Sequence, residues 1–302
     1  MKLGGHETFY PRPGWFTKGL LHLQSGGAGA FSLPEVADEL GVGRNMAKSI
    51  GWWLHVMGLG SRPSRNGPIE LTDFGAVVAE RDPFMAHLGT WWLLHASAMT
   101  SATGSSLPWF FSPRRADRAD RAALAEALLK DMSSGKAKPP AIKTIQREVA
   151  AVLQTYAVPV PRPLRDPEDN LGSPFHRLDL WRHLRASDRF ERSEPTAAPP
   201  EALGMVLSAL ATNQPAQSLQ EGVLLDIAVA SPLLGRAGAF FGRSREGLLT
   251  IVDDGERALG SSTISLRSLA GERVVTVKSA RAASWACSFY DRMAAQARED
   301  AA

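Results

Sequence analysis

The N-terminal stretch GGHETFYPRPGWFTKG, residues 4–19, gathers side chains that could do chemistry. His6 and Glu7 stand next to each other, and by type they could transfer a proton or bind a metal ion. A metal site needs further ligands at a regular spacing, such as H-E-x-x-H, and none of the seven histidines has that spacing. A nucleophile elbow and a Gly-Lys-Ser/Thr phosphate loop are also missing. The sequence therefore predicts a protein that is not an enzyme, with no catalytic residue, no metal ligand and no cofactor.

The aromatic residues of the same stretch favour a structural interpretation. Phe9, Trp15 and Phe16 can seat the N-terminus in a hydrophobic core, and the prolines between them keep the approach extended. We interpret the stretch chiefly as an N-terminal clasp. If it has a binding role, phosphate contact by Arg12 and Lys18 is the alternative that their side chains favour.

A second set of polar residues lies on one face of an expected helix that begins near residue 44. The set recurs at intervals of 4, 4 and 3 residues, with Asn45 alongside, and consists of Arg44, Lys48, Trp52 and His55. Arg and Asn can form paired hydrogen bonds with guanine and adenine edges in a major groove. DNA binding is therefore one hypothesis for this face. Packing against another part of the protein is the other, and Trp52 fits both.

Two further groups of residues could contact nucleic acid. Arg62 and Arg65 flank an Asn-Gly dipeptide, where a hairpin wing would meet phosphates or the minor groove. A smaller polar set lies on an expected helix in the middle of the chain and consists of Lys143, Gln146 and Arg147. For that set an ordinary solvated face is the competing explanation.

The composition describes a globular protein with a mild basic excess. Of the 302 residues, 44% are hydrophobic and 22% are charged, which excludes a disordered chain. The net charge of +3 is compatible with nucleic acid but not diagnostic of it. No apolar run is long enough to cross a bilayer, no signal pattern opens the chain, and the single Cys287 excludes an internal disulfide. We therefore expect a cytoplasmic protein with no membrane partner.

The elements around the first polar face follow the order of a winged helix-turn-helix. Ser32 and Glu35 have the spacing of a capping box, and glycines then form a tight turn before the helix at residue 44. The Asn-Gly dipeptide between two short extended stretches predicts a hairpin. The apolar stripe of the second helix is expected to consist of Met46, Ile50, Trp53, Leu54 and Met57.

The rest of the chain gives weaker versions of this pattern. We expect a mainly α fold with small β-hairpin wings, built from tandem winged helix-turn-helix-like modules. The expected domains are an N-terminal clasp with a winged helix-turn-helix (1–96), a helical middle domain with a second helix-turn-helix (97–195) and a winged-helix-like C-terminal domain (196–302). In the last of these, TISLRSLAGERVVTV is read as two strands around Ala270 and Gly271.

Several motifs together resemble the bacterial family known as domain of unknown function 4007. They are the His-Glu-Thr-Phe start, the segment DPFMAHLGTWWLLHASAMTSATGSSLPWFF, AIKTIQREVAAVLQTYA with EDNLGSP, and SPLLGRAGAFFGRSREGLLTIVDD. The resemblance covers nearly the whole chain, although its C-terminal end follows the family more loosely. It implies an association with gene clusters for DNA phosphorothioation and phage defence. It transfers no catalytic residue.

These observations lead to a non-catalytic, DNA-binding accessory subunit of a sulfur-linked DNA-modification or phage-defence system. The partners expected are double-stranded DNA and proteins of the same cluster, of the sulfur-transfer or ATPase type, together with a possible homo-oligomer. One alternative is a scaffold that holds the enzymes of the cluster, and another is a transcriptional regulator of the cluster. A further alternative is a nuclease or other hydrolase that uses His6 and Glu7.

Overall fold

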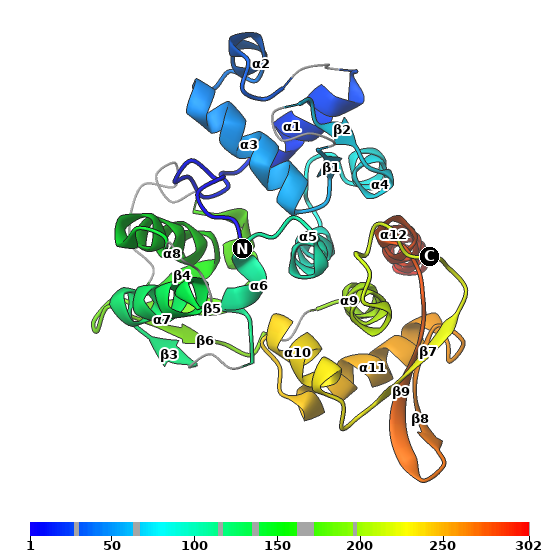
Figure 1. Cartoon of the computed structure of the whole chain (residues 1–302). Coiled ribbons are helices and arrows are strands. Elements are labelled where there is room, and N and C mark those ends of the chain that lie inside the picture. Colours follow the sequence, from blue (N-terminus) through cyan, green and yellow to red (C-terminus); the bar gives the residue numbers. More distant parts are fainter. Residues whose placement is uncertain are drawn as a thin grey trace.

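The computed structural model describes residues 1–26, 30–62, 67–113, 117–134, 139–161, 172–195 and 198–301. Within these ranges the chain is a mixed α/β protein that is mainly helical, with three small sheets (Figure 1). The expectation of a mainly α fold with small sheets is confirmed in this coarser form. None of the described helices combines the length and the apolar character that crossing a bilayer would need.

The N-terminal part contains the predicted helices and a pair of strands where the sequence predicts a hairpin, although Asn66 of its turn lies outside the described residues. The expected capping box is wrong, because Leu33 rather than Ser32 is the N-cap of the second helix and no side chain caps it. Phe16 and Leu20 bury one face of the first helix, and Thr72 caps the last helix by accepting a hydrogen bond from the Gly75 amide. The two short strands pair antiparallel. The elements are α1 (Trp15–Gln24), α2 (Pro34–Glu39), α3 (Arg44–Val56), β1 (Gly60–Ser61), β2 (Glu70–Leu71) and α4 (Asp73–Arg81).

The helix α5 (Leu88–Thr100) lies at the centre of the molecule and is followed by the short α6 (Leu107–Phe110) (Figure 1). Its sequence is apolar on all sides, and ten consecutive residues, 90–99, are buried. The buried His95 bonds to the Tyr156 hydroxyl through Nδ1 (3.0 Å) and to the Phe240 carbonyl through Nε2 (2.7 Å). This helix therefore joins all three expected domains, and the expected boundary between residues 96 and 97 falls inside it.

The middle part differs from the expected helical domain because it contains a four-stranded sheet. The strand order is β3-β6-β5-β4, and β4 and β5 are parallel. These strands have only two to four residues and expose Arg and His side chains, so no clear alternation marks them in the sequence. The elements are β3 (Arg118–Ala119), α7 (Arg121–Ser133), α8 (Ile142–Tyr156), β4 (Ala157–Val160), η1 (Pro174–Leu178), β5 (Trp181–Leu184) and β6 (Arg189–Arg192).

The C-terminal part combines four helices with a three-stranded antiparallel sheet of order β7-β9-β8. The two predicted strands around Ala270 and Gly271 are confirmed, and both turn residues have positive φ angles. The elements are α9 (Pro200–Thr212), β7 (Leu224–Ala228), α10 (Pro232–Phe240), α11 (Arg245–Leu259), β8 (Ile264–Leu269), β9 (Glu272–Lys278) and α12 (Ala282–Glu299). One continuous hydrophobic core extends through all three parts.

Candidate nucleic-acid interface

The helix α3 is set against α2 by a tight turn and a buried apolar stripe. Gly41 adopts a φ of 62°, a left-handed conformation that favours glycine, and the Val42 amide donates to the Ala37 carbonyl. The predicted stripe on α3 is confirmed, since Met46 is partly buried and the other members, Ile50, Trp53, Leu54 and Met57, are fully buried. The rotation of α3 is thereby fixed, and so is the face that it presents to solvent.

The first turns of α3 present the predicted polar residues to solvent. Arg44 and Asn45 are exposed and Lys48 is half-buried. No acidic residue lies in the first turn of this helix. Two cations and one amide therefore share the open N-terminal end of α3, next to the turn that follows α2.

The later turns of α3 are covered by the N-terminal segment, residues 2–10. The His6 ring meets the half-buried Trp52 edge to face at 5.3 Å, and a Cβ at Gly5 would lie 2.1 Å from the Trp52 indole nitrogen. Ser49 Oγ donates to the His6 carbonyl (2.9 Å), and Trp53 Nε1 donates to the Phe9 carbonyl (3.2 Å). The polar face predicted from the sequence is therefore split into an open end and a covered end.

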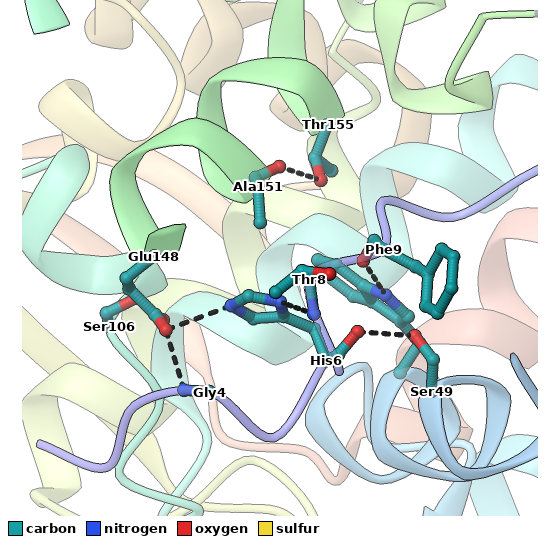
Figure 2. Close-up of polar contacts among 10 residues, drawn as sticks. Gly4, His6, Thr8, Phe9, Ser49, Ser106, Glu148, Ala151 and Thr155 are labelled. Carbon is teal, nitrogen blue, oxygen red and sulfur yellow. Dashed lines mark hydrogen bonds and ion pairs between the residues drawn. The ribbon is translucent and has the colours of Figure 1, made fainter. Parts of the chain in front are cut away.

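The same segment is held from its other side by Glu148 of α8 (Figure 2). The Glu148 carboxylate is fully buried and accepts hydrogen bonds from the Gly4 amide (2.8 Å), from His6 Nε2 (2.9 Å) and from Ser106 Oγ (2.6 Å). The segment thus lies between α3 and α8, as Figure 1 also shows. His6 is its central residue, since it bonds to α8 through its ring and to α3 through its carbonyl.

The hydrogen bonds assign the tautomer of His6. The Thr8 amide donates to His6 Nδ1 (3.0 Å), so this nitrogen carries a lone pair and Nε2 carries the proton that points to Glu148. Burial raises the pKa of Glu148, but the hydrogen bonds from His6, Ser106 and Gly4 outweigh it and hold that pKa below its ordinary value. Glu148 is therefore a carboxylate at neutral pH, and its acceptor positions are used to anchor the segment.

This arrangement supports the interpretation of residues 4–19 as a clasp. Trp15 and Phe16 are buried, while Phe9 is half-buried. Glu7, the sequence neighbour of His6, is exposed and takes no part in the network. The partner of His6 is instead Glu148, which sequence reasoning missed.

One signal could have identified Glu148. It stands on the apolar face of its helix, between Ile145 and Val152, where an unpartnered charge is costly. A carboxylate in such a position predicts a buried donor, although 142 residues separate it from His6 and no spacing rule connects them.

The remaining predicted residues of the first module are in different environments. His55 is half-buried, and this burial lowers its pKa. The hydrogen bond with the Gly60 carbonyl raises the pKa in part, whereas the positive charges of Arg62 and Lys2 lower it further. Arg62 is also half-buried, burial lowers its pKa, and its Nε has no hydrogen-bond partner within the described protein. Arg65 lies outside the described residues.

The smaller set on α8 and the two cations of the clasp are exposed. Lys143, Gln146 and Arg147 lie on the solvent side of the helix that carries Glu148. Arg12 stacks over Phe9 and Trp15 at 5.9 and 6.0 Å. Lys18 Nζ donates to the Leu40 carbonyl (2.9 Å), so its ammonium group also closes the turn after α2.

Among the described residues, no three His, Cys, Asp or Glu side chains converge closely enough to hold a metal ion. The acidic stretch at residues 166–170 lies outside the described part of the chain. We therefore identify no metal site among the described residues.

The fold and this surface define a mainly helical α/β protein in which the open end of α3 is basic. The chain belongs to the family described as "Protein of unknown function (DUF4007)", whose model matches residues 3–288, and the predicted family is confirmed. No curated protein matches the chain.

Two solved structures share the fold. "Magnesium ion-bound SspB crystal structure" has a TM-score of 0.76 and 22% sequence identity, and "SspB crystal structure" has a TM-score of 0.74 and 22% identity. Each comparison covers 98% of this chain and 87% of the other. At this identity the likeness describes the fold alone.

Proposed function

We propose that this protein is a non-catalytic, DNA-binding accessory subunit of a bacterial DNA-modification or phage-defence system. The observation that carries the proposal is the open N-terminal end of α3, where Arg44, Asn45 and Lys48 stand together. In helix-turn-helix proteins, the residues at the N-terminal end of the recognition helix contact base edges. The link to DNA phosphorothioation comes from the family resemblance.

The neighbouring elements support a winged helix-turn-helix in this part. The order of α1, α2, α3 and the β1–β2 hairpin is that of the motif. Arg62 stands next to β1, and its buried Nε has no hydrogen-bond partner among the described residues, so a phosphate oxygen could supply the missing acceptor. We propose that it contacts a phosphate at the edge of the groove.

The covered end of α3 has a different role in this proposal. Trp52 contacts His6 and His55 bonds to the Gly60 carbonyl of β1, so we assign Trp52 to holding the N-terminal segment and His55 to holding the hairpin, rather than either to base contact. The segment carries Arg12 at its exposed end and bridges to α8, where Lys143 and Arg147 are exposed. A DNA backbone that leaves α3 would therefore meet further cations on this side.

A second candidate function, a protein-interaction scaffold, is favoured by the C-terminal part. Its elements α9, β7, α10, α11, β8 and β9, with sheet order β7-β9-β8, follow the order of a winged helix. The exposed surface of α11 carries Glu246, Asp253 and Asp254 together with Arg257, which pairs with Asp254, so it is acidic on balance and repels phosphates. We propose that this part binds protein, while the N-terminal part binds DNA. Retention of basic partner proteins by the chain, lost on reversing Asp253 and Asp254 to Lys, would support this role.

Duplex binding measured by fluorescence anisotropy over a series of salt concentrations tests the DNA-binding proposal. Removing two phosphate-neutralising cations with Arg44→Ala and Lys48→Ala should weaken binding and reduce the salt slope by about 1.8. The matched control is Lys278→Ala with Arg298→Ala, which removes two exposed cations from β9 and α12. Wild-type binding no tighter than that of an unrelated basic protein would overturn the proposal.

The non-catalytic part of the proposal needs its own test. One of the two SspB structures is described as magnesium ion-bound, so Mg²⁺ is the cation to supply. Supercoiled plasmid incubated with the protein and Mg²⁺ should stay intact. Nicking or cleavage that disappears in His6→Ala would show that the protein is a nuclease.

A further inference from the structure

A cavity of about 220 Å³ opens beside the C-terminal end of α8, outside the α3 surface. Its walls come from the N-terminal segment, both middle helices, η1 and three strands of the middle sheet. The lining residues are Tyr10, Arg121, Leu153, Gln154, Ala157, Pro159, Gly172, His176, His183 and Phe190.

The described residues that line the cavity include several planar side chains and one permanent cation, Arg121. His183 stacks on Phe190 with ring centroids 4.4 Å apart and planes 7° from parallel, and the Arg121 guanidinium lies 5.3 Å from the same ring. Phe190 itself is only 2% exposed, so the planar groups that a ligand would meet are those of His183, Arg121, Tyr10 and His176. Bases in single strands stack on such rings and on guanidinium planes.

The charges around the cavity favour an anion. No Asp or Glu is among the described residues that line it. The exposed Asp188 contacts it indirectly, since it accepts a hydrogen bond from His183 Nε2 at 2.7 Å. Arg121 stands at the first position of α7, next to the N-cap Asp120, whose carboxylate accepts a hydrogen bond from the Ala123 amide and offsets part of the positive end of that helix.

The volume restricts the size of the ligand. About 150 Å³ is enough to accept a benzene ring, whereas pockets for drug-sized ligands and cofactors have roughly 300–1,000 Å³. A cavity of 220 Å³ therefore holds one base, and the sugar and phosphate of a nucleotide would lie outside it, toward the exposed Arg121. A dinucleotide or another large cofactor does not fit.

The polar face of α8 extends from Lys143 and Arg147, which the DNA-binding proposal places near the DNA backbone, to this cavity. Lys143, Arg147 and Gln154 are exposed and recur at intervals of 4 and 7 residues, which places them on one side of the helix. The stretch from Lys143 to Gln154 is roughly 16 Å long at 1.5 Å per residue, about five base-pair steps of a strand. Two cations on this path precede the cavity.

We propose that the cavity binds one unpaired nucleotide of a DNA strand, with the base against the planar side chains and the phosphate at Arg121. The proposal rests on the proposed DNA-binding function and extends it to single-stranded or locally opened DNA. Extraction of a base from a duplex costs a few kcal/mol, so an already unpaired nucleotide is the preferred ligand.

The direct test is titration of the full chain with deoxyadenosine monophosphate, followed by ligand-observed NMR, with inorganic phosphate as the comparison ligand. We expect the nucleotide to bind more tightly than phosphate. Arg121→Ala should weaken nucleotide binding about tenfold through the lost charged hydrogen bond, while Arg298→Ala, an exposed arginine on α12, should have no effect.

A second pair of variants separates binding from folding. The Gln154 side chain is exposed at the cavity, so Gln154→Lys and Gln154→Glu keep the fold while changing one charge. At separations of about 4–8 Å in water, one added charge changes the affinity roughly two- to sixfold for each negative charge of the nucleotide phosphate, upward for Lys and downward for Glu. Equal affinity in both variants, or nucleotide binding no tighter than phosphate binding, would overturn the proposal.

Failure of this inference is distinguishable from failure of the proposed function. If the cavity does not bind a nucleotide, duplex binding would still depend on Arg44 and Lys48. If the proposed function fails, duplex binding is absent, whereas nucleotide binding can still be measured. A strand with one unpaired nucleotide should bind more tightly than the fully paired duplex, and this difference should vanish in Arg121→Ala.

Discussion

Replacing Glu148 with alanine should detach the N-terminal segment from the body of the protein. The carboxylate is fully buried and accepts hydrogen bonds from Gly4, His6 and Ser106. Alanine leaves His6 Nε2 and Ser106 Oγ without acceptors in the core, and each unsatisfied buried donor costs about 1–3 kcal/mol. Together with the Gly4 amide, these donors lead us to expect a loss of about 3–5 kcal/mol in the free energy of unfolding.

Thermal unfolding measures this loss. With an unfolding entropy of about 2.1 cal/mol/K per residue, a chain of 302 residues should lose about 5–8 °C in Tm. The matched control is Glu126→Ala on α7, an exposed position where the change should stay within about 0.5 kcal/mol. Amide exchange of Gly4 and Thr8 should also increase in Glu148→Ala, because their hydrogen-bond acceptors are lost or displaced.

The pH dependence gives a second measure of the same site. Since the pKa of Glu148 is lower in the folded chain than the ordinary value of 4.5, its stabilising contribution is present above pH 4.5. The contribution is lost as pH falls through the folded pKa. The stability difference between wild type and Glu148→Gln should therefore be constant near neutral pH and shrink below pH 4.5.

Two outcomes would refute this account of the clasp. One is a Tm for Glu148→Ala equal to that of Glu126→Ala. The other is unchanged amide exchange at Gly4 and Thr8, because the segment would then be held by contacts that do not involve the carboxylate.

Two further predictions concern His95 and Arg62. Burial lowers the pKa of His95 to about 4, so the wild type should lose about 3 kcal/mol of stability between pH 7.5 and pH 4, because the unfolded chain takes up the proton first. In urea unfolding, His95→Gln should lack this pH-dependent loss. An equal pH dependence of stability in both proteins would contradict the prediction. Arg62→Met should keep or raise Tm, because it removes a half-buried guanidinium whose Nε has no hydrogen-bond partner among the described residues, and should weaken duplex binding in the anisotropy assay. A lowered Tm with unchanged binding would assign Arg62 to the fold instead.

The sequence predicted those parts of the fold that local patterns specify. The stripe of α3 and the hairpin at Ala270 and Gly271 depend on helical spacing and turn chemistry, so both could be recognised without tertiary information. The four-stranded middle sheet could not, since the parallel pairing of β4 with β5 joins short strands over a long separation in the sequence.

The candidate site was predictable only where local helical spacing determines it. Helical spacing placed Arg44 and Lys48 on one face, but it carried no information about what else would lie on that face. The N-terminal segment covers Trp52 because His6 is anchored to Glu148, a contact between residues 142 positions apart. The division of α3 into an open and a covered end is therefore a tertiary effect.

Disulfide crosslinking from the open end of α3 tests the central proposal most directly. The chain has one cysteine, Cys287, so Asn45→Cys with Cys287→Ser provides a single thiol for duplex DNA that carries a tethered thiol on a base. The matched control places the thiol on the acidic face of α11, as Glu246→Cys with Cys287→Ser. We expect crosslinking from position 45 that decreases with rising salt, and little from position 246. Equal crosslinking from both positions would contradict a DNA interface at the open end of α3.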